Sequence, residues 1–310
     1  MTEPRPPQRW LAAAFSLTGG GRFHASMAVI VTALFLADQF LVPRAGLHGA
    51  GEKLSGLLYL IPFAVICVYC SWRGFERLFD VLSIFVWSCA LGFTMMPFVP
   101  LAARTAAPLI DQSLARLDRM VVDTATIVQW VSRFSTLNQV LTTAYRSVPP
   151  FVITALFLPA VIGLGAASRR FLLSVALAVL ITLGLFAVWP AAGPWTTEGL
   201  TPTQSQSEIT AYLLALKTGQ PMDIDYRLGG IVAFPSFHTA LAILAALALR
   251  RIRFIRWFAL GLAVAVCIST VTTGWHYLVD VLGGLGVAWL VDTLAGFVVT
   301  REDPRTRLLS

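Results

Sequence analysis

The stretch "IVAFPSFHTALAILAALAL" (residues 231–249) holds 19 residues, and His238 is its one ionisable side chain. At about 1.5 Å per residue, a helix of this length just spans the roughly 30 Å hydrocarbon core of a bilayer. Its first part nevertheless contains a proline, a serine and a histidine. We therefore predict a membrane helix whose first turn carries polar groups that do chemistry.

The rest of the chain is also rich in apolar runs. Hydrophobic residues make up 57% of the 310 residues, charged residues 13%, and the mean hydropathy is +0.75. Soluble domains carry about 25% charged residues, so a water-soluble fold is excluded. Seven further runs are long enough to cross a bilayer, at residues 25–43, 55–72, 81–103, 151–168, 171–192, 257–275 and 278–299. The predicted fold class is all-α, a polytopic membrane helical bundle of about eight transmembrane helices.

The basic residues predict the orientation of the bundle. With the N-terminus in the cytoplasm, the inner segments hold 14 of the 23 Lys and Arg residues, as expected for cytoplasmic loops. The clearest anchor is "RRIRFIR" (residues 250–256), which directly follows the 231–249 segment. This anchor places His238 at the outer face, and the next span brings His276 to that same face. Residues 1–24 and 300–310 are predicted to be cytoplasmic.

The formal charge of +7 is explained by these loops and does not indicate nucleic-acid binding, because no run of base-stacking aromatic residues accompanies it. Arginine outnumbers lysine 21 to 2, which is typical of a GC-rich bacterial genome. The predicted location is therefore a bacterial inner membrane, with the outer face in the periplasm.

Two outer segments are long. Residues 104–150 are amphipathic and predict one or two helices lying on the bilayer surface, which either shape lipid access or form a purely structural cover. Residues 193–230 are polar and rich in turn-forming residues, and they lead directly into the segment that carries His238. A tight cytoplasmic hairpin is predicted at Arg169 and Arg170, between the fourth and fifth spans.

The second histidine, His276, stands four residues before Asp280 in "TTGWHYLVDVLGG". On a helix the two side chains share a face, so the carboxylate accepts a hydrogen bond from one imidazole nitrogen. That bond fixes the tautomer and leaves the other nitrogen free as a nucleophile or base. Ionisable residues at the end of a membrane span are costly, and this cost favours a functional interpretation of the pair.

The "PSFH" stretch predicts an anion site. Proline suits the first turn of a helix, where its missing N–H is not needed. Ser236 and the free N–H groups of that turn would face a negatively charged group, and His238 would donate a proton to a leaving group. Together with His276 and Asp280, these residues indicate phosphoryl transfer through a phosphohistidine. This scheme needs no metal and no other cofactor.

The motifs "FPSFHTA" (Phe234–Ala240) and "STVTTGWHYLVDVLGG" (Ser269–Gly284) resemble the second and third signature motifs of the phosphatidic acid phosphatase type 2 superfamily. The resemblance implies that His276 is the nucleophile, Asp280 its orienting carboxylate and His238 the general acid. It implies that Ser236 and the amide of Phe237 hold the phosphate. It also implies a six-helix catalytic bundle over residues 81–299, with residues 25–72 as two additional transmembrane helices.

Two departures from the family pattern concern the cations that clamp the phosphate. Thr270 stands where the third motif usually has arginine, and the first motif, with its Lys and Arg-Pro, is absent. We expect Lys217 or Arg227 to substitute, with Gly230 letting the backbone approach the phosphate. These losses and "HYLVD" resemble the inositol-phosphotransferase branch, which includes inositol phosphorylceramide synthases. That branch implies transfer of a headgroup such as inositol phosphate from a phospholipid to an alcohol acceptor, here at the outer leaflet.

Two alternatives stay open. The same residues suit a phosphatase that hydrolyses lipid phosphates or diphosphates, and the sequence does not decide between water and an alcohol as acceptor. A membrane transporter with a His/Asp relay would show inverted repeats and polar groups at mid-membrane.

A zinc site lacks further ligands, because His24 is on the opposite side and His48 in a distant loop. The sequence leaves the oligomeric state open.

Overall fold

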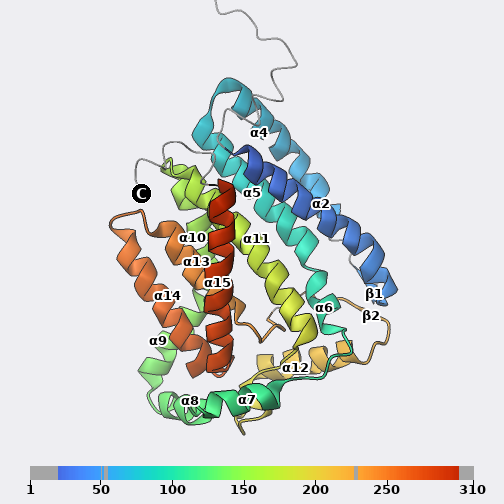
Figure 1. Ribbon diagram of the computed structural model, residues 1–310, viewed down its shortest axis with the longest axis vertical. Coiled ribbons are helices and arrows are strands. Elements are labelled where there is room, and N and C mark those ends of the chain that lie inside the picture. The colour runs from blue at the N-terminus through green and yellow to red at the C-terminus, as the bar shows by residue number, and fades with distance from the viewer. Residues whose placement is uncertain (1–19, 50, 52–54, 227–229, 300–310) are drawn as a thin grey trace, which may run out of the picture.

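The computed structural model describes residues 20–49, 51, 55–226 and 230–299, and they are mostly helical (Figure 1). The helices are α2 (Gly21–Arg44), η1 (Ser55–Leu60), α4 (Ile61–Arg73), α5 (Glu76–Met95), α6 (Phe98–Ala103), α7 (Asp111–Arg119), α8 (Thr124–Ser132), α9 (Ser135–Arg146), α10 (Val148–Val161), α11 (Gly165–Val188), η2 (Pro194–Thr196), α12 (Gln204–Lys217), α13 (Phe237–Leu249), α14 (Ile255–Thr272) and α15 (Leu278–Val299). Two short strands, β1 (Leu47–His48) and β2 (Met222–Asp223), pair in parallel. The predicted all-α polytopic membrane fold is confirmed.

Among the described residues, six helical segments are long and apolar enough to cross a membrane, and they start at Gly21, Ser55, Glu76, Gly165, Ile255 and Leu278. The pair α9 and α10, bent by 43° at its junction, forms a seventh if it is one span. The eighth predicted segment contains α13, which has 13 residues and is about 20 Å long. The predicted count of about eight is thus reached if α9 and α10 form one span and if α13 crosses the membrane together with the chain before it.

The chain before α13 is not helical, although the sequence predicts one span over residues 231–249. Ile231, Ala233 and Ser236 are nevertheless almost completely buried. Non-helical backbone is tolerated at membrane depth where protein surrounds it. The helix cannot start earlier because Pro235 would clash with the preceding turn and could not donate to it.

Helix α13 lies inside the bundle and packs against α10, α11, α14 and α15 (Figure 1). Its buried side is built from alanines, of which Ala240, Ala242 and Ala245 are fully buried. Small side chains let neighbouring helices approach closely, which is how membrane helices gain packing energy without a hydrophobic driving force. Helix α13 as a whole is therefore surrounded by four other helices.

The predicted hairpin at Arg169 and Arg170 is wrong. The turn lies at residues 162–164, with Gly163 in the left-handed region at φ 89°, and both arginines are inside α11. Arg169 pairs with Asp80, and Arg170 pairs with Asp292, its Nε 2.7 Å from Oδ1. Because carboxylates from neighbouring helices neutralise these charges, α11 continues through both arginines without a break.

One end of the bundle is covered by helices lying across it, namely α7, α8 and α12 at the bottom of Figure 1. The segment 104–150, predicted to hold one or two surface helices, holds α7, α8 and α9, and α9 leads into α10. The segment 193–230, predicted as a polar loop, contains α12. A capping box between Thr203 and Gln206 starts that helix.

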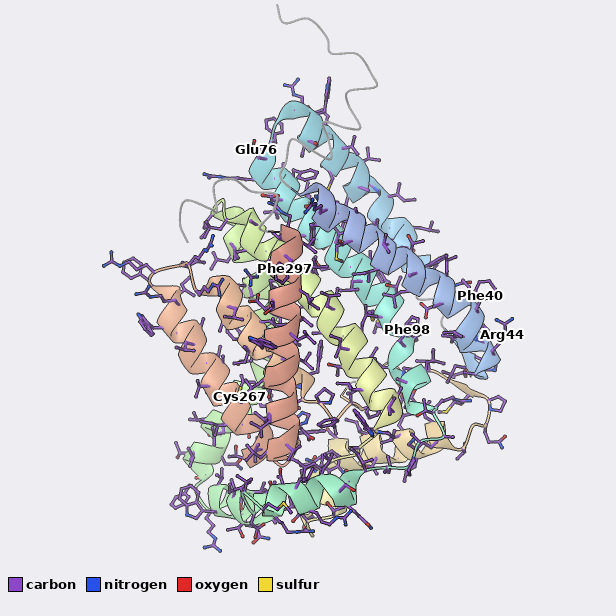
Figure 2. All side chains as sticks on the ribbon, viewed as in Figure 1. Phe40, Arg44, Glu76, Phe98, Cys267 and Phe297 are labelled. Atoms are coloured by element: carbon purple, nitrogen blue, oxygen red, sulfur yellow. The ribbon has the colours of Figure 1, made fainter. Side chains whose placement is uncertain are left out.

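Large apolar side chains are exposed along the flanks of the long helices, as Phe40 of α2 and Phe297 of α15 show in Figure 2. The exposed fraction is 58% for Phe40 and 72% for Trp289. Such a surface is stable in lipid and not in water. The protein is therefore a multi-pass membrane protein.

The chain that follows α2 is tied to the rest of the protein by Arg104, at the end of α6. Its guanidinium donates to the carbonyl of Ala45 and also to those of Gly219 and Gln220. Beside this contact, β1 pairs with β2. The chain after α2 is thereby joined to the chain that follows α12.

Candidate active site

The two predicted catalytic histidines lie at the same end of the bundle. His276 is in the short connection between α14 and α15, and His238 is the second residue of α13. Their ring centroids are 6.2 Å apart and their planes are inclined by 55°. At this separation both rings are within reach of one phosphate group.

The hydrogen bonds of His276 fix its tautomer. Nδ1 is 2.9 Å from the carbonyl oxygen of Ala233 and 3.4 Å from Oδ2 of Asp280. A carbonyl and a carboxylate only accept hydrogen bonds, so Nδ1 carries the proton and Nε2 keeps its lone pair. Burial lowers the pKa of His276 to about 4, although the bond to Ala233 acts in the opposite direction. The ring is therefore uncharged at neutral pH.

Asp280 meets His276 in a different way from the predicted pairing on one helix face. His276 precedes α15, and Asp280 is in the first turn of that helix. Its Oδ2 also accepts a hydrogen bond from the backbone N–H of Tyr277, 2.9 Å away. Asp280 is fully buried, and its Oδ1 has no hydrogen-bond partner among the described residues. Its carboxylate therefore both caps α15 and orients the imidazole.

The start of α13 is held by Ser236. The serine Oγ accepts a hydrogen bond from the N–H of Thr239 at 3.3 Å, and the serine N–H donates to the backbone carbonyl of Asp280 at 2.9 Å. Pro235 therefore lies before the helix cap, not in the first turn as predicted. The N–H groups of Phe237 and His238 have no hydrogen-bond partner in the described part of the chain. These two donors are available for an anion.

Two glycines of α15 let the start of α13 approach. A Cβ on Gly284 would lie 2.4 Å from the carbonyl oxygen of Ser236, and a Cβ on Gly283 would lie 3.0 Å from Cβ of Pro235. The carbonyl oxygen is part of the backbone and the proline ring is bonded to it, so neither can move aside without a shift of the backbone. The "GG" of the "DVLGG" stretch is thus the reason that the two histidine-bearing segments can meet.

The remaining predicted phosphate-binding residues are placed differently. Thr270 is fully buried, its Oγ1 donates to the Cys267 carbonyl at 2.8 Å, and its own carbonyl accepts from the N–H of His276. Thr270 thus holds the backbone of the nucleophile candidate. Lys217 donates to the carbonyls of Thr105 and Ala107, at 3.2 and 2.8 Å. Within the described residues no contact joins Lys217 to either histidine.

The other two predicted phosphate-binding residues lie between α12 and α13. Gly230 is exposed and has a φ of 86°, which favours glycine. Arg227 lies outside the described residues.

An aromatic cluster beside His238 was missed by the sequence reasoning. The ring of Tyr145, from α9, stacks on His238 with centroids 4.5 Å apart, and it is nearly parallel to Trp275 at 6.0 Å. Trp195 meets Trp275 edge to face at 5.5 Å. These rings come from three segments far apart in the chain, so no local pattern identifies them.

Two buried aspartates of α7 were also missed. Asp118 accepts hydrogen bonds from the N–H groups of Leu278 and Val279, both at 3.0 Å, and so caps the start of α15. Asp111 accepts from the N–H groups of Ala192 and Gly193. The two aspartates are seven residues apart and share the buried face of α7 with Leu114. In the sequence, two carboxylates on the apolar face of an amphipathic helix were the signal that these aspartates are buried and bonded.

No group of three or more His, Cys, Asp or Glu side chains is arranged to hold a metal ion among the described residues. Cys67 and Cys70, which have a metal-like spacing, are buried free thiols.

Comparison with known proteins identifies the family. The family model of the PAP2 superfamily matches residues 112–294, more than half of the chain, and this range includes both histidines and Asp280. No curated protein matches the chain. No solved structure matches it either. On the strength of the family match over the histidine-bearing half of the bundle, the chain belongs to the PAP2 (phosphatidic acid phosphatase type 2) superfamily.

Proposed function

We propose that this protein is a membrane lipid phosphotransferase that moves a phosphoryl headgroup, such as inositol phosphate, between a lipid and an alcohol acceptor. Membership of the PAP2 superfamily supports a phosphatase or phosphotransferase activity. The single observation that carries the finer proposal is the state of His276, neutral and with Nε2 free, next to His238 at a centroid distance of 6.2 Å.

In the first step Nε2 of His276 attacks phosphorus and forms a P–N bond. The P–O bond to the donor alcohol breaks, and His238, protonated once the anionic phosphate lies beside it, gives its proton to the departing oxygen. The positive charge that develops on the His276 ring is stabilised by the carboxylate of Asp280, 3.4 Å from Nδ1. In the second step the acceptor hydroxyl gives its proton to His238 and attacks phosphorus, and the P–N bond breaks. Both histidines return to their starting states.

The non-bridging oxygens of phosphate are held, in this proposal, by the start of α13. The free N–H groups of Phe237 and His238 point out of a helix N-terminus, where the helix dipole favours negative charge. Ser236 fixes this turn through its cap. Lys217 and Arg227 are the cations that the sequence offers to complete the phosphate site, and Lys217 would have to leave the carbonyls of Thr105 and Ala107 to do so.

An alcohol acceptor is favoured over water by the surroundings of the histidines. His276 is 4% exposed. Tyr145 covers one face of His238, and Trp275 and Trp195 extend the aromatic wall. A site enclosed in this way excludes bulk water during the second step and favours a bound acceptor. Hydrolysis of a lipid phosphate is the competing outcome of the test below.

The proposed location of the site is the outer leaflet. The histidines lie at one end of α13, and Arg250, Arg251, Arg253 and Arg256 follow its other end. Because arginines gather on the cytoplasmic side of membrane proteins, the histidine end faces outward. Donor and acceptor lipids would then enter from the outer leaflet of a bacterial inner membrane.

The decisive experiment is to trap the covalent intermediate. Purified protein is incubated with phosphatidylinositol carrying radiolabelled phosphorus and then denatured in alkali, in which phosphohistidine is stable. We expect label on the wild-type chain and none on the His276→Asn variant. The matched control is His48→Asn, the same change at an exposed histidine of β1, which should label like the wild type. Label on the His276→Asn chain would rule out the proposed nucleophile.

The products then distinguish transfer from hydrolysis. With phosphatidylinositol labelled in its inositol and a lipid alcohol as acceptor, transfer gives a new labelled lipid. A water-soluble labelled product formed in place of that lipid would show that the protein is a hydrolase.

A further inference from the structure

A second charged site lies at the end of the bundle opposite the histidines. There α11, α13 and α15 enclose a cavity whose lining includes Arg170, Arg250, Arg251, Asp292 and Ser174. The cavity has a volume of about 50 Å³, which is room for a few oxygen atoms of a ligand or for a few waters. The cavity shares no residue with the candidate active site.

The charges around this cavity are unbalanced. Arg170 is matched by Asp292, which accepts hydrogen bonds from its Nε and Nη2. Arg250 and Arg251 are exposed and form no ion pair or hydrogen bond with any described residue. Two uncompensated positive charges therefore border one cavity.

An independent observation also indicates a missing acceptor. Ser174 is fully buried and lines the cavity, yet its hydroxyl has no hydrogen-bond partner among the described residues. A buried hydroxyl without a partner destabilises the fold, because it has lost its hydrogen bonds to water. An oxygen atom of an anion in the cavity would accept this hydrogen bond.

The surroundings of the cavity are those of a membrane interface. In the chain that follows Arg251, Phe254 is 89% exposed, and Trp257 and Phe258 are 66% and 71% exposed. Arg256 lies over the Trp257 ring at 5.0 Å. Arginines and aromatic side chains together are typical of the headgroup region of a bilayer. The anionic headgroups of lipids are therefore the anions nearest to this cavity.

From these observations we infer that the cavity binds the phosphate of an anionic phospholipid from the leaflet opposite the active site. Arg250 and Arg251 pair with the phosphate, and Ser174 donates to one of its oxygens. Phe171, Leu244 and Leu247 provide the apolar wall on which the glycerol region rests. Basic pockets between membrane helices are known to take lipid headgroups for the same electrostatic reason.

The chain from residue 250 to residue 256 offers a matched test. Two of its four arginines, Arg250 and Arg251, line the cavity, whereas the other two do not. Protein in a neutral detergent is mixed with a few equivalents of phosphatidylglycerol, and bound lipids are counted by native mass spectrometry. We expect one retained phosphatidylglycerol on the wild type and about thirtyfold weaker retention for the double variant Arg250→Gln/Arg251→Gln. The double variant Arg253→Gln/Arg256→Gln, with the same change of charge, should bind like the wild type.

A second variant probes the buried hydroxyl without altering any charge. Ser174→Ala should weaken phosphatidylglycerol binding about fivefold, because one hydrogen bond is lost. Phosphatidylcholine, which is zwitterionic, should be retained poorly by every variant.

Three outcomes would overturn the inference. Equal losses for the two double variants would show a general attraction to basic residues and no site. Unchanged retention after Arg250→Gln/Arg251→Gln would exclude these arginines as ligands. Displacement of the lipid by millimolar inorganic phosphate would show that the cavity takes a small anion and not a phospholipid. The four substituted arginines are exposed and form no ion pair with any described residue, and the one ring contact, of Arg256 with Trp257, is itself exposed, so melting temperatures should match the wild type and folding does not confound the test.

Discussion

Asp118 positions the backbone that follows the nucleophile. Its two carboxylate oxygens accept the N–H groups of Leu278 and Val279, two and three residues after His276, and Oδ2 also accepts from Thr124. A carboxylate at a helix start satisfies donors that the helix itself leaves free and interacts favourably with the helix dipole. The place of the His276 ring therefore depends on a residue that does not touch it.

The change Asp118→Asn tests this positioning role. The amide NH₂ group must replace one acceptor oxygen, so at least one backbone donor of α15 loses its partner. We expect a free energy of unfolding lower by about 1–2 kcal/mol. Because a small displacement of a nucleophile slows chemistry without weakening binding, kcat should fall by about a hundredfold while KM changes little.

Asp123→Asn is the matched control for that change. Asp123 caps α8, where its Oδ1 accepts from the N–H of Thr126 at 3.2 Å, and it is exposed. This variant loses a cap of the same kind that belongs to α8 and makes no hydrogen bond to α15, so its kcat should stay at the wild-type value. Equal losses of kcat in the two variants would show that Asp118 acts only through stability.

At the scale of elements, the contact between α13 and α15 assembles the site. Ser236 at the start of α13 donates to the carbonyl of Asp280 in the first turn of α15. The close approach requires that Gly284 have no side chain. Of the two glycines that allow the approach, Gly284 is the one whose added Cβ would come nearest to the other segment.

Gly284→Ala should separate these two helix starts. The new Cβ would lie 2.4 Å from the Ser236 carbonyl oxygen, so the backbone must shift. We expect a free energy of unfolding lower by about 1–3 kcal/mol and activity reduced more than tenfold, measured by thermal unfolding and lipid turnover.

Gly286→Ala, two residues further along α15, is the control. A Cβ there meets no atom within 4 Å, so the change should keep full activity and raise stability by up to about 1 kcal/mol, since alanine favours the helix. Wild-type activity in Gly284→Ala would contradict the close-packing explanation.

At the scale of the whole molecule, the two N-terminal helical segments pack on the bundle to different extents. Helix α2 packs against α5, α11 and α15, whereas α4 packs against α5 and η1. Arg104 then joins the chain after α2 to the chain after α12. The segment that leads toward His238 is thus anchored on its way by the N-terminal part of the protein.

Arg104→Gln should loosen this anchor. The N–H groups of Met222 and Ile224, which donate to the carbonyls of Gly46 and His48, should exchange with deuterium about ten times faster. Arg44→Gln is the control, because Arg44 is exposed and, among the described residues, its side chain donates only to Phe40 of its own helix. Unchanged exchange at β2 in Arg104→Gln would show that the strand pairing alone joins the two parts.

Local patterns predicted much of this architecture. Apolar runs of span length marked the long helices, and "PSFH" and "HYLVD" marked the two segments that meet. The predictions failed where residues far apart in the sequence offset the cost of placing a charged side chain inside the bundle. Arg169 and Arg170 suggested a turn, yet Asp80 and Asp292 neutralise them within the bundle.

The sequence by itself determined that the chain is a helical membrane protein and that His238, His276 and Asp280 belong to one motif pair, because hydropathy and short motifs are properties of neighbouring residues. Only the tertiary structure decided which nitrogen of His276 is free, since the carbonyl that fixes it belongs to Ala233, 43 residues away. Tertiary structure also decided that Asp118 caps a helix 160 residues further along the chain. Hydrogen bonds depend on distances in space, and those exist only once the helices have packed.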